Sequence, residues 1–236
     1  MNTKQRLIKF ENWVKNKHSS LEELFPTLQK KEAVHINLSE NNPTVKTETE
    51  FNNPSYFQSK LDDIQLQNQT KIIAGGYLEK RALYTSDIYN AANSTEKRNI
   101  HLGVDFWLPE QTPVTSFLNG KIVCAVHQKD YKGYGGFVIL EHQMDDVVFY
   151  TLYGHLSKKS VEQLATKTRL KKGEQIGVLG NYEENGEWVP HLHFQVMLDL
   201  LSYTNDFPGV ALESEIEFWK TICPNPNLLF KLKALF

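Results

Sequence analysis

From about residue 72 onward, short runs in which apolar and polar residues alternate follow one another, with glycine, proline and asparagine between them. Alternation with a period of two places successive side chains on opposite faces of an extended chain, so it is typical of strands that bury one face. The runs predict a mostly antiparallel β unit. The expected strands cover residues 102–107, 113–117, 119–127, 135–142, 147–154, 174–179 and 191–198.

The segments on either side of this unit have a different pattern. Residues 1–30 repeat apolar side chains near helical spacing and predict a helical lead-in. Residues 36–70 are rich in Asn, Thr, Glu and Gln and predict an extended polar linker. Further helices or turns are expected at residues 160–166, 211–222 and 226–235.

Together these patterns predict a chain that is mainly β and α+β overall. The expected parts are an N-terminal helical extension with a polar linker at residues 1–71, a β domain at 72–205 and a helical tail at 206–236. The net charge of −2 provides no basic field for a nucleic acid, and no apolar run approaches the ~20 residues that cross a bilayer. We therefore expect neither a nucleic-acid partner nor a transmembrane segment.

Two of the expected strands carry residue types that bind metals. In HLGVDFW, alternation puts His101 and Asp105 on one face with only Gly103 between them, while the opposite face is apolar. In PHLHFQVML, His191 and His193 share a face in the same way. Either pair alone is a weak signal. The combination of both pairs, in strands whose opposite faces are apolar, indicates a shared polar site.

A third strand, in FYTLYGHLS, is expected to present Tyr153 and His155 on one face. Aromatic side chains give contact area with a polar tip, so Trp107, Tyr134, Tyr153 and Trp188 are candidates for the wall of a substrate groove. Core packing is the alternative interpretation for each of the four. Tyr153 and Trp188 are retained as the groove candidates.

Histidine and aspartate without a cysteine cluster are typical of a catalytic zinc site, which uses three protein ligands and leaves one position for water. Zinc lowers the pKa of water from about 15.7 toward about 7, and an imidazole with an ordinary pKa of about 6.5 can take the proton. Four histidines and one aspartate therefore divide into ligands and helpers. The remaining histidines of the unit, His127 and His142, flank polar turns and are predicted to be solvated.

In this order, HLGVD, YGHL and PHLHF resemble the HxxxD, internal His and HxH motifs of the lysostaphin/LytM-like zinc metalloendopeptidases, a family of the duplicated-hybrid-motif type. The resemblance covers about residues 98–200. It implies an antiparallel β-sheet metallopeptidase core with short C-terminal helices. It also implies that His101, Asp105 and His193 bind Zn²⁺, one ion per chain.

The same resemblance implies that the substrate is bacterial cell-wall peptidoglycan or muropeptides, in which peptide bonds are hydrolysed by a metal-activated water. His155 and His191 would act as general base and transition-state stabiliser, in an order that stays open. One alternative is a catalytically silent relative that binds peptidoglycan or activates an amidase; such proteins lack several of the five residues. The other is a lipoyl- or biotinyl-type β module, which would need a lysine at a tight hairpin tip.

Two expectations concern the N-terminal part. The first residues mix charges where an export signal would be apolar, so the localisation is left open between the cell envelope and the cytoplasm. The asparagine-rich residues 41–53 suggest a further hypothesis, because in some relatives of this kind an upstream asparagine occupies the open metal position and holds the enzyme latent. The alternative for this segment is a solvated linker.

Overall fold

The structure is a computed structural model that describes residues 1–17, 19–42, 44–45, 47–84, 86–91, 96–145 and 147–236. Its α-helices are α1 (Thr3–Lys15), α2 (Glu48–Asn52), α3 (Pro54–Gln67), α4 (Lys158–Leu164), α5 (Ile216–Ile222) and α6 (Asn227–Phe230). Its strands are β1 (Glu32–His35), β2 (Lys71–Gly75), β3 (Ile100–His101), β4 (Val104–Trp107), β5 (Pro113–Thr115), β6 (Gly120–His127), β7 (Gly136–Met144), β8 (Val147–Leu156), β9 (Arg169–Leu170), β10 (Gln175–Val178), β11 (His191–Met197) and β12 (Val210–Ala211). Short 3-10 helices are η1 (Leu21–Glu23), η2 (Asp87–Tyr89), η3 (Glu213–Glu215) and η4 (Lys233–Leu235).

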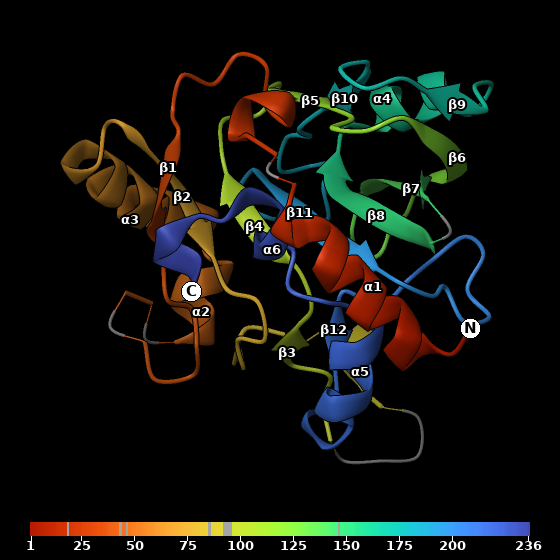
Figure 1. The fold of residues 1–236 in the computed structure, drawn as a ribbon. Helices are drawn as coiled ribbons and strands as arrows, with labels where there is room; N and C mark the ends of the chain where they lie inside the picture. The colour runs from red at the N-terminus through yellow and green to blue at the C-terminus, as the bar shows by residue number, and fades with distance from the viewer. Residues whose placement is uncertain (18, 43, 46, 85, 92–95, 146) are drawn as a thin grey trace.

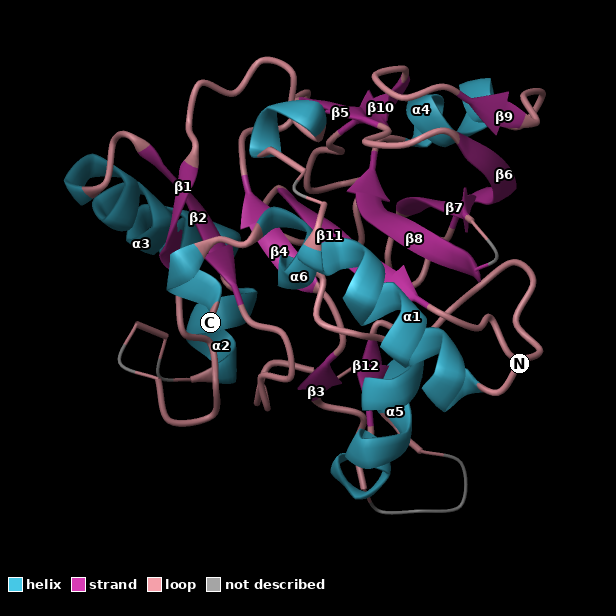
Figure 2. Cartoon of the chain, viewed as in Figure 1, coloured by secondary structure: helices cyan, strands magenta, loops and turns pink. Residues whose placement is uncertain are grey.

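An eight-stranded sheet in the order β1-β2-β4-β11-β8-β7-β6-β9 dominates the fold (Figure 1). Only β1 and β2 pair in parallel; every other neighbour in this sheet is antiparallel. Helices lie against the sheet and at its ends (Figure 2). The predicted α+β fold class with a mostly antiparallel sheet is therefore confirmed. None of the described helices is long and apolar enough to span a bilayer.

One face of the sheet is mainly apolar and packs against α1 and α6. The cap at Asn2 starts α1, which buries Phe10 and Val14 one turn apart on a single side. Fully burying a large apolar side chain stabilises the fold by roughly 1.5–3 kcal/mol. This face is the main core because it buries more apolar side chains than either of the other two clusters. Its members from the central strands and the covering helices include Val104, Phe106, Leu192, Phe194, Leu229 and Phe230.

The opposite face of the sheet holds two separate apolar clusters. One packs α5 through Trp219 and Ile222 against the sheet, and the other packs α2 and α3 through Phe51 and Phe57 against Trp107. Asp105, His191 and His193 lie on this face, between the two clusters. The helices of the N-terminal and C-terminal parts therefore flank the candidate site from both sides.

The prediction of a polar linker over residues 36–70 is wrong for its second half, which forms α2 and α3. Thr47 caps α2, and Asn53 caps α3 with Pro54 in its first turn. Thr, Asn and Pro are favoured at these positions because they satisfy or remove the unpaired N–H groups of a helix start. The polar residues that made the segment look unstructured are thus partly helix caps, and β1 and β2 extend the main sheet beside it.

The strands expected from the alternation are present, but two changes affect the site: an interruption before β4, and an irregularity in β8 that is described with the site. The run HLGVDFW, expected to be extended throughout, is interrupted at residues 102–103: His101 lies in β3, which pairs with β12, and β4 begins at Val104 instead of at residue 102. The short helices expected after the strands also form, as α4, α5 and α6.

Candidate metal centre

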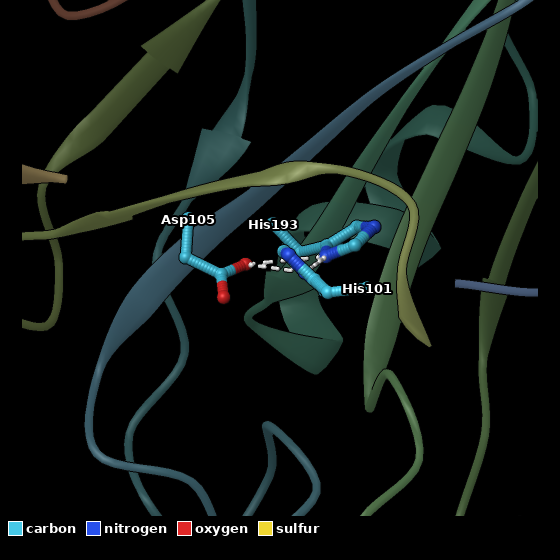
Figure 3. Close-up of side chains that lie close together, drawn as sticks. All are labelled: His101, Asp105 and His193. Atoms are coloured by element: carbon cyan, nitrogen blue, oxygen red, sulfur yellow. Dashed lines mark hydrogen bonds and ion pairs between the residues drawn. The ribbon is translucent and has the colours of Figure 1, made fainter. Parts of the chain in front are cut away.

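The centre is assembled on β11, which lies between β4 and β8. His193 on β11 pairs directly with Asp105 on β4 and with Gly154 on β8. His101 comes from β3, which two non-strand residues separate from β4. Figure 3 shows the two imidazole rings and the carboxylate pointing toward one another.

Three ligand atoms meet within hydrogen-bond distance at this point. His101 Nε2 lies 2.9 Å from His193 Nδ1, and each of these nitrogens lies 3.2 Å from Asp105 Oδ1. All three side chains are buried. Among the described residues they form the one cluster of three or more His, Cys, Asp or Glu side chains that could hold a metal ion.

The outward-facing atoms of the two histidines are held by fixed acceptors. His101 Nδ1 lies 2.9 Å from the carbonyl oxygen of Gly76, which can only accept, so Nδ1 carries the hydrogen and Nε2 is bare. His193 Nε2 lies 2.9 Å from Oε1 of Gln195, and donation there leaves Nδ1 bare. These two hydrogen bonds determine that the other ring nitrogen of each histidine, without a hydrogen, faces the cluster.

The carboxylate of Asp105 is backed by a cation. The Arg81 guanidinium donates to Oδ2 at 2.7 Å, so Oδ1 is the oxygen that faces the histidines. Burial alone would raise the pKa of Asp105, but His101 and Arg81 beside it hold that pKa well below its usual range. Asp105 is therefore an anion, as a metal ligand must be.

His101 Nε2, His193 Nδ1 and Asp105 Oδ1 thus point lone pairs at one another without a hydrogen between them. This arrangement fits a cation. A tetrahedral zinc site with ligand distances of about 2.0–2.1 Å has ligand atoms roughly 3.3 Å apart, close to the separations found here. Burial lowers the pKa of His101 to about 4, so its ring is neutral and able to ligate near neutral pH. The donor set of two imidazoles and one carboxylate leaves a position open for a water or substrate atom.

Gly103 allows this close approach. A Cβ atom at Gly103 would lie 2.6 Å from Cε1 of His193, a separation that carbon atoms do not tolerate. The glycine noted between His101 and Asp105 is therefore required by the packing of the two motifs on each other.

Two further histidines lie beside the cluster. His191 Nε2 is 3.8 Å from Asp105 Oδ1, and the rings of His155 and His191 are 4.3 Å apart at their centroids. Each ring donates its Nδ1 hydrogen to a backbone carbonyl, that of Asn185 for His155 and that of Val189 for His191. Burial, with the neighbouring histidines, holds the pKa of His155 well below its usual range, and burial lowers that of His191.

The prediction that Tyr153 shares a face with His155 is wrong. Between Val138 and Gly136 the register of β8 shifts, and His155 has a left-handed backbone with φ of 66°. Such a bulge adds one residue to the strand and reverses its alternation. Tyr153 consequently lies in the apolar core with Leu156, fully buried, and does not reach the groove.

A cavity of about 280 Å³ opens beside the five polar residues. Trp188, the other groove candidate, does line it, and its indole N–H donates to the carbonyl of Gly133. Trp107 and Tyr134 also line the cavity. One further wall comes from α2, which belongs to the asparagine-rich residues 41–53 of the latency hypothesis. The other walls come from segments that the sequence did not implicate, at α3, residues 81–84, 88–89 and 206–210, and the lining of all these walls includes Phe51, Asn52, Phe57, Tyr84, Tyr89 and Pro208.

Some contributors to the site were not found from the sequence. Gln195 lies two residues after His193, so the same alternation places it on the site face, and this signal was available. Arg81 and Gly76 lie in an irregular segment and carry no pattern that points to the site. Asn52, from the asparagine-rich segment, lines the cavity and its Oδ1 is buried without a hydrogen bond; whether this segment holds the enzyme latent stays a prediction.

The other two histidines of the β unit lie away from the centre. His142 was predicted to be solvated, and this is wrong, because its side chain is 1% exposed between β7 and β8. Its two ring nitrogens lie 2.9 Å from the Asn119 carbonyl and 2.8 Å from the Thr151 hydroxyl. His127 is half-buried and lies 2.9 Å from the carbonyl of Glu184.

Comparison with known proteins points to one family. Residues 99–204 match the model of peptidase family M23. Lysostaphin of Staphylococcus staphylolyticus is 32% identical over 141 residues, 56% of this chain and 26% of the relative. Glycyl-glycine endopeptidase ALE-1 of Staphylococcus capitis is 34% identical over 121 residues, 51% of this chain and 29% of the relative. The matches thus span about a quarter of the length of these relatives.

A solved structure of the catalytic domain of lysostaphin from Staphylococcus simulans is 26% identical, with a TM-score of 0.37, and the match covers 66% of this chain and 96% of that one. The family match begins just before His101 and ends after His193, so it contains all five polar residues of the site. The part of the chain that resembles peptidase family M23 is therefore residues 99–204, which hold the complete His101, Asp105 and His193 cluster.

Proposed function

We propose that this chain is a zinc-dependent endopeptidase that hydrolyses peptide bonds of bacterial cell-wall peptidoglycan or of muropeptides. One observation carries the proposal: two bare imidazole nitrogens and one carboxylate oxygen converge within 3.2 Å, beside two further histidines and an open cavity. His101, Asp105 and His193 would hold one zinc ion. His155 and His191 would do the proton chemistry next to it.

When bound, zinc supplies Lewis acidity, which polarises a peptide carbonyl and makes water a nucleophile near neutral pH. The chain's own residues supply the rest. Asp105 and Arg81 keep one carboxylate oxygen directed at the cluster. His155 and His191 each have one nitrogen fixed on a backbone carbonyl, so the other can accept a proton from water and later donate it to the leaving amine.

The cavity supports a peptide substrate. Aromatic side chains on its walls offer apolar contact area, and Trp188 is fixed by its hydrogen bond to Gly133. The relative named glycyl-glycine endopeptidase cleaves peptide bonds, as its name states, and the residues that match the family model contain the site. We therefore place the scissile peptide in this cavity, with Trp188 as a groove residue.

The proposal is tested by digestion of defined muropeptides and purified sacculi, with products identified by mass spectrometry. The expected result is new peptide ends that appear with zinc-loaded protein, disappear after chelation and return when zinc is added back. Elemental analysis should find one zinc per chain. Binding to sacculi without any product, by protein that contains stoichiometric zinc, would contradict the proposal and favour a catalytically silent relative.

A further inference from the structure

The side chain of Gln195 lies fully buried behind His193, between the candidate centre and the C-terminal part of the chain. Its Oε1 is 2.9 Å from His193 Nε2. Its Nε2 is 3.2 Å from the carbonyl oxygen of Pro208 and 3.3 Å from Sγ of Cys223. Every polar atom of this amide therefore has a partner, and one of those partners is a candidate metal ligand.

The partners determine which way the amide points. The carbonyl oxygen of Pro208 can only accept a hydrogen bond, so the amide nitrogen of Gln195 must face it and Oε1 must face His193. An amide oxygen can also only accept, so His193 must present an N–H at Nε2. The other ring nitrogen, Nδ1, is then left bare toward His101 and Asp105.

The opposite tautomer of His193 would be penalised twice. A bare Nε2 would face the oxygen of Gln195, and an N–H at Nδ1 would occupy the space where the ligand atoms meet. Metal-binding histidines generally donate their second N–H to a fixed acceptor, which sets the tautomer and the ring orientation. Here the acceptor is itself fixed by a carbonyl and a thiol from the segment that follows residue 204.

We propose that Gln195 is a positioning residue that fixes the tautomer and ring orientation of His193, and that Pro208 and Cys223 hold Gln195 in the required direction. The inference rests on the zinc site of the proposed function. It extends that site beyond the family match at residues 99–204, because both holding groups lie outside this range. The chain after residue 204 is therefore a working part of the metal centre.

The first test is the tautomer of His193 in the metal-free wild-type protein. Long-range nitrogen–proton spectra of protein labelled with nitrogen-15 histidine distinguish a protonated ring nitrogen from a bare one. We expect His193 to be protonated at Nε2 and bare at Nδ1. A majority of the Nδ1-protonated form would overturn the proposal, and this measurement needs no variant.

The second test is the substitution Gln195→Met, which keeps much of the side-chain volume but removes the acceptor. We expect zinc to bind about 10- to 100-fold more weakly, measured by competition with a chelating dye, and the tautomers of His193 to become mixed. Gln195→Glu keeps an acceptor in front of Nε2 but loses the N–H that faces the carbonyl of Pro208, so its zinc affinity should lie between those of wild type and Gln195→Met. Unchanged zinc affinity and an unchanged tautomer in Gln195→Met would overturn the proposal.

A matched control separates positioning from general destabilisation. Thr151 is also fully buried and also bonds a histidine, His142, away from the centre. Thr151→Val should lower the unfolding temperature without changing the zinc affinity, whereas Gln195→Met should lower both. Equal losses of zinc affinity in the two variants would show a structural effect only and would overturn the role of Gln195.

Cys223→Ala removes one of the two groups that hold the amide and leaves Pro208 in place. We expect a smaller loss of zinc affinity than in Gln195→Met. A larger loss would contradict the proposal that Cys223 acts on His193 through Gln195. None of these measurements uses a peptide substrate. If wild-type protein binds zinc with the expected tautomer but cleaves no peptidoglycan, the proposed function fails and the role of Gln195 stands.

Discussion

Two buried histidines on neighbouring parts of the same sheet, His142 on β7 and His193 on β11, differ in what their second nitrogen meets. Both are nearly inaccessible to solvent. His142 donates from Nδ1 to a carbonyl and accepts at Nε2 from the Thr151 hydroxyl, so both nitrogens of the neutral ring have a hydrogen-bond partner. His193 donates to Gln195 on one side, but on the other its bare nitrogen meets a second bare nitrogen and a carboxylate.

This difference separates a structural histidine from a candidate ligand better than burial does. A buried polar group without a partner costs free energy, and two acceptors in contact repel each other. The arrangement around His142 needs nothing more, whereas the one around His193 becomes favourable when a cation is shared by the three acceptors. The candidate centre is thus a place where folding alone leaves polar groups unmatched.

The largest expected effect comes from removing a ligand. Asp105→Asn keeps an oxygen for Arg81 but removes the anionic ligand, and His101→Ala removes an imidazole, so neither variant should retain stoichiometric zinc or detectable peptidase activity. Elemental analysis and the muropeptide digest measure both properties. His142→Gln is the matched control on a buried histidine, and it should keep both. Full zinc content in Asp105→Asn would remove Asp105 from the ligand set.

The next effect separates the helper histidines from the ligands. His191→Ala and His155→Ala should keep zinc and lose about 10²- to 10⁴-fold in kcat, equivalent to about 3–5 kcal/mol, because they remove general acid–base chemistry. Zinc content and kcat are measured on the same preparations. Loss of zinc from His191→Ala would instead place His191 among the ligands.

A smaller effect is expected on stability. Zinc at about 100 times its Kd should stabilise the folded wild-type protein by about 2.7 kcal/mol, because the unfolded chain has no assembled site. Thermal unfolding with zinc and with a chelator measures this. The difference should vanish in Asp105→Asn and persist in His142→Gln. The same shift in all three proteins would mean that zinc binds elsewhere.

The smallest effect concerns pH and the structural histidine. Burial lowers the pKa of His142 from 6.5 to about 4, so the unfolded chain binds a proton at a higher pH than the folded one. Its contribution to stability is therefore complete above pH 6.5 and is lost as the pH falls toward 4, by about 2 kcal/mol between pH 7 and pH 5. Wild-type protein should lose that much more stability than His142→Gln in denaturant titrations of metal-free protein at both pH values. Equal losses would show that His142 stays uncharged in both states.

Alternation in the sequence was enough to predict most strands and to put His191 and His193 on one face; His101 and Asp105 also meet, although β3 and β4 are separate strands. It did so because a period of two is a local property of an extended chain. It failed at His155, where a bulge reverses the alternation and sends Tyr153 into the core. It also failed before residue 72, where the polar residues that resemble a linker include the caps of α2 and α3.

By itself, the sequence determined which residue types stand on which strand faces, and with them the chemistry of the centre. Only the tertiary structure decided how those residues are held. The carbonyl of Gly76 behind His101, Arg81 behind Asp105, and Pro208 with Cys223 behind Gln195 all come from segments without a repeating pattern. Contacts between distant parts of the chain arise from packing, and packing leaves no period in the sequence to read.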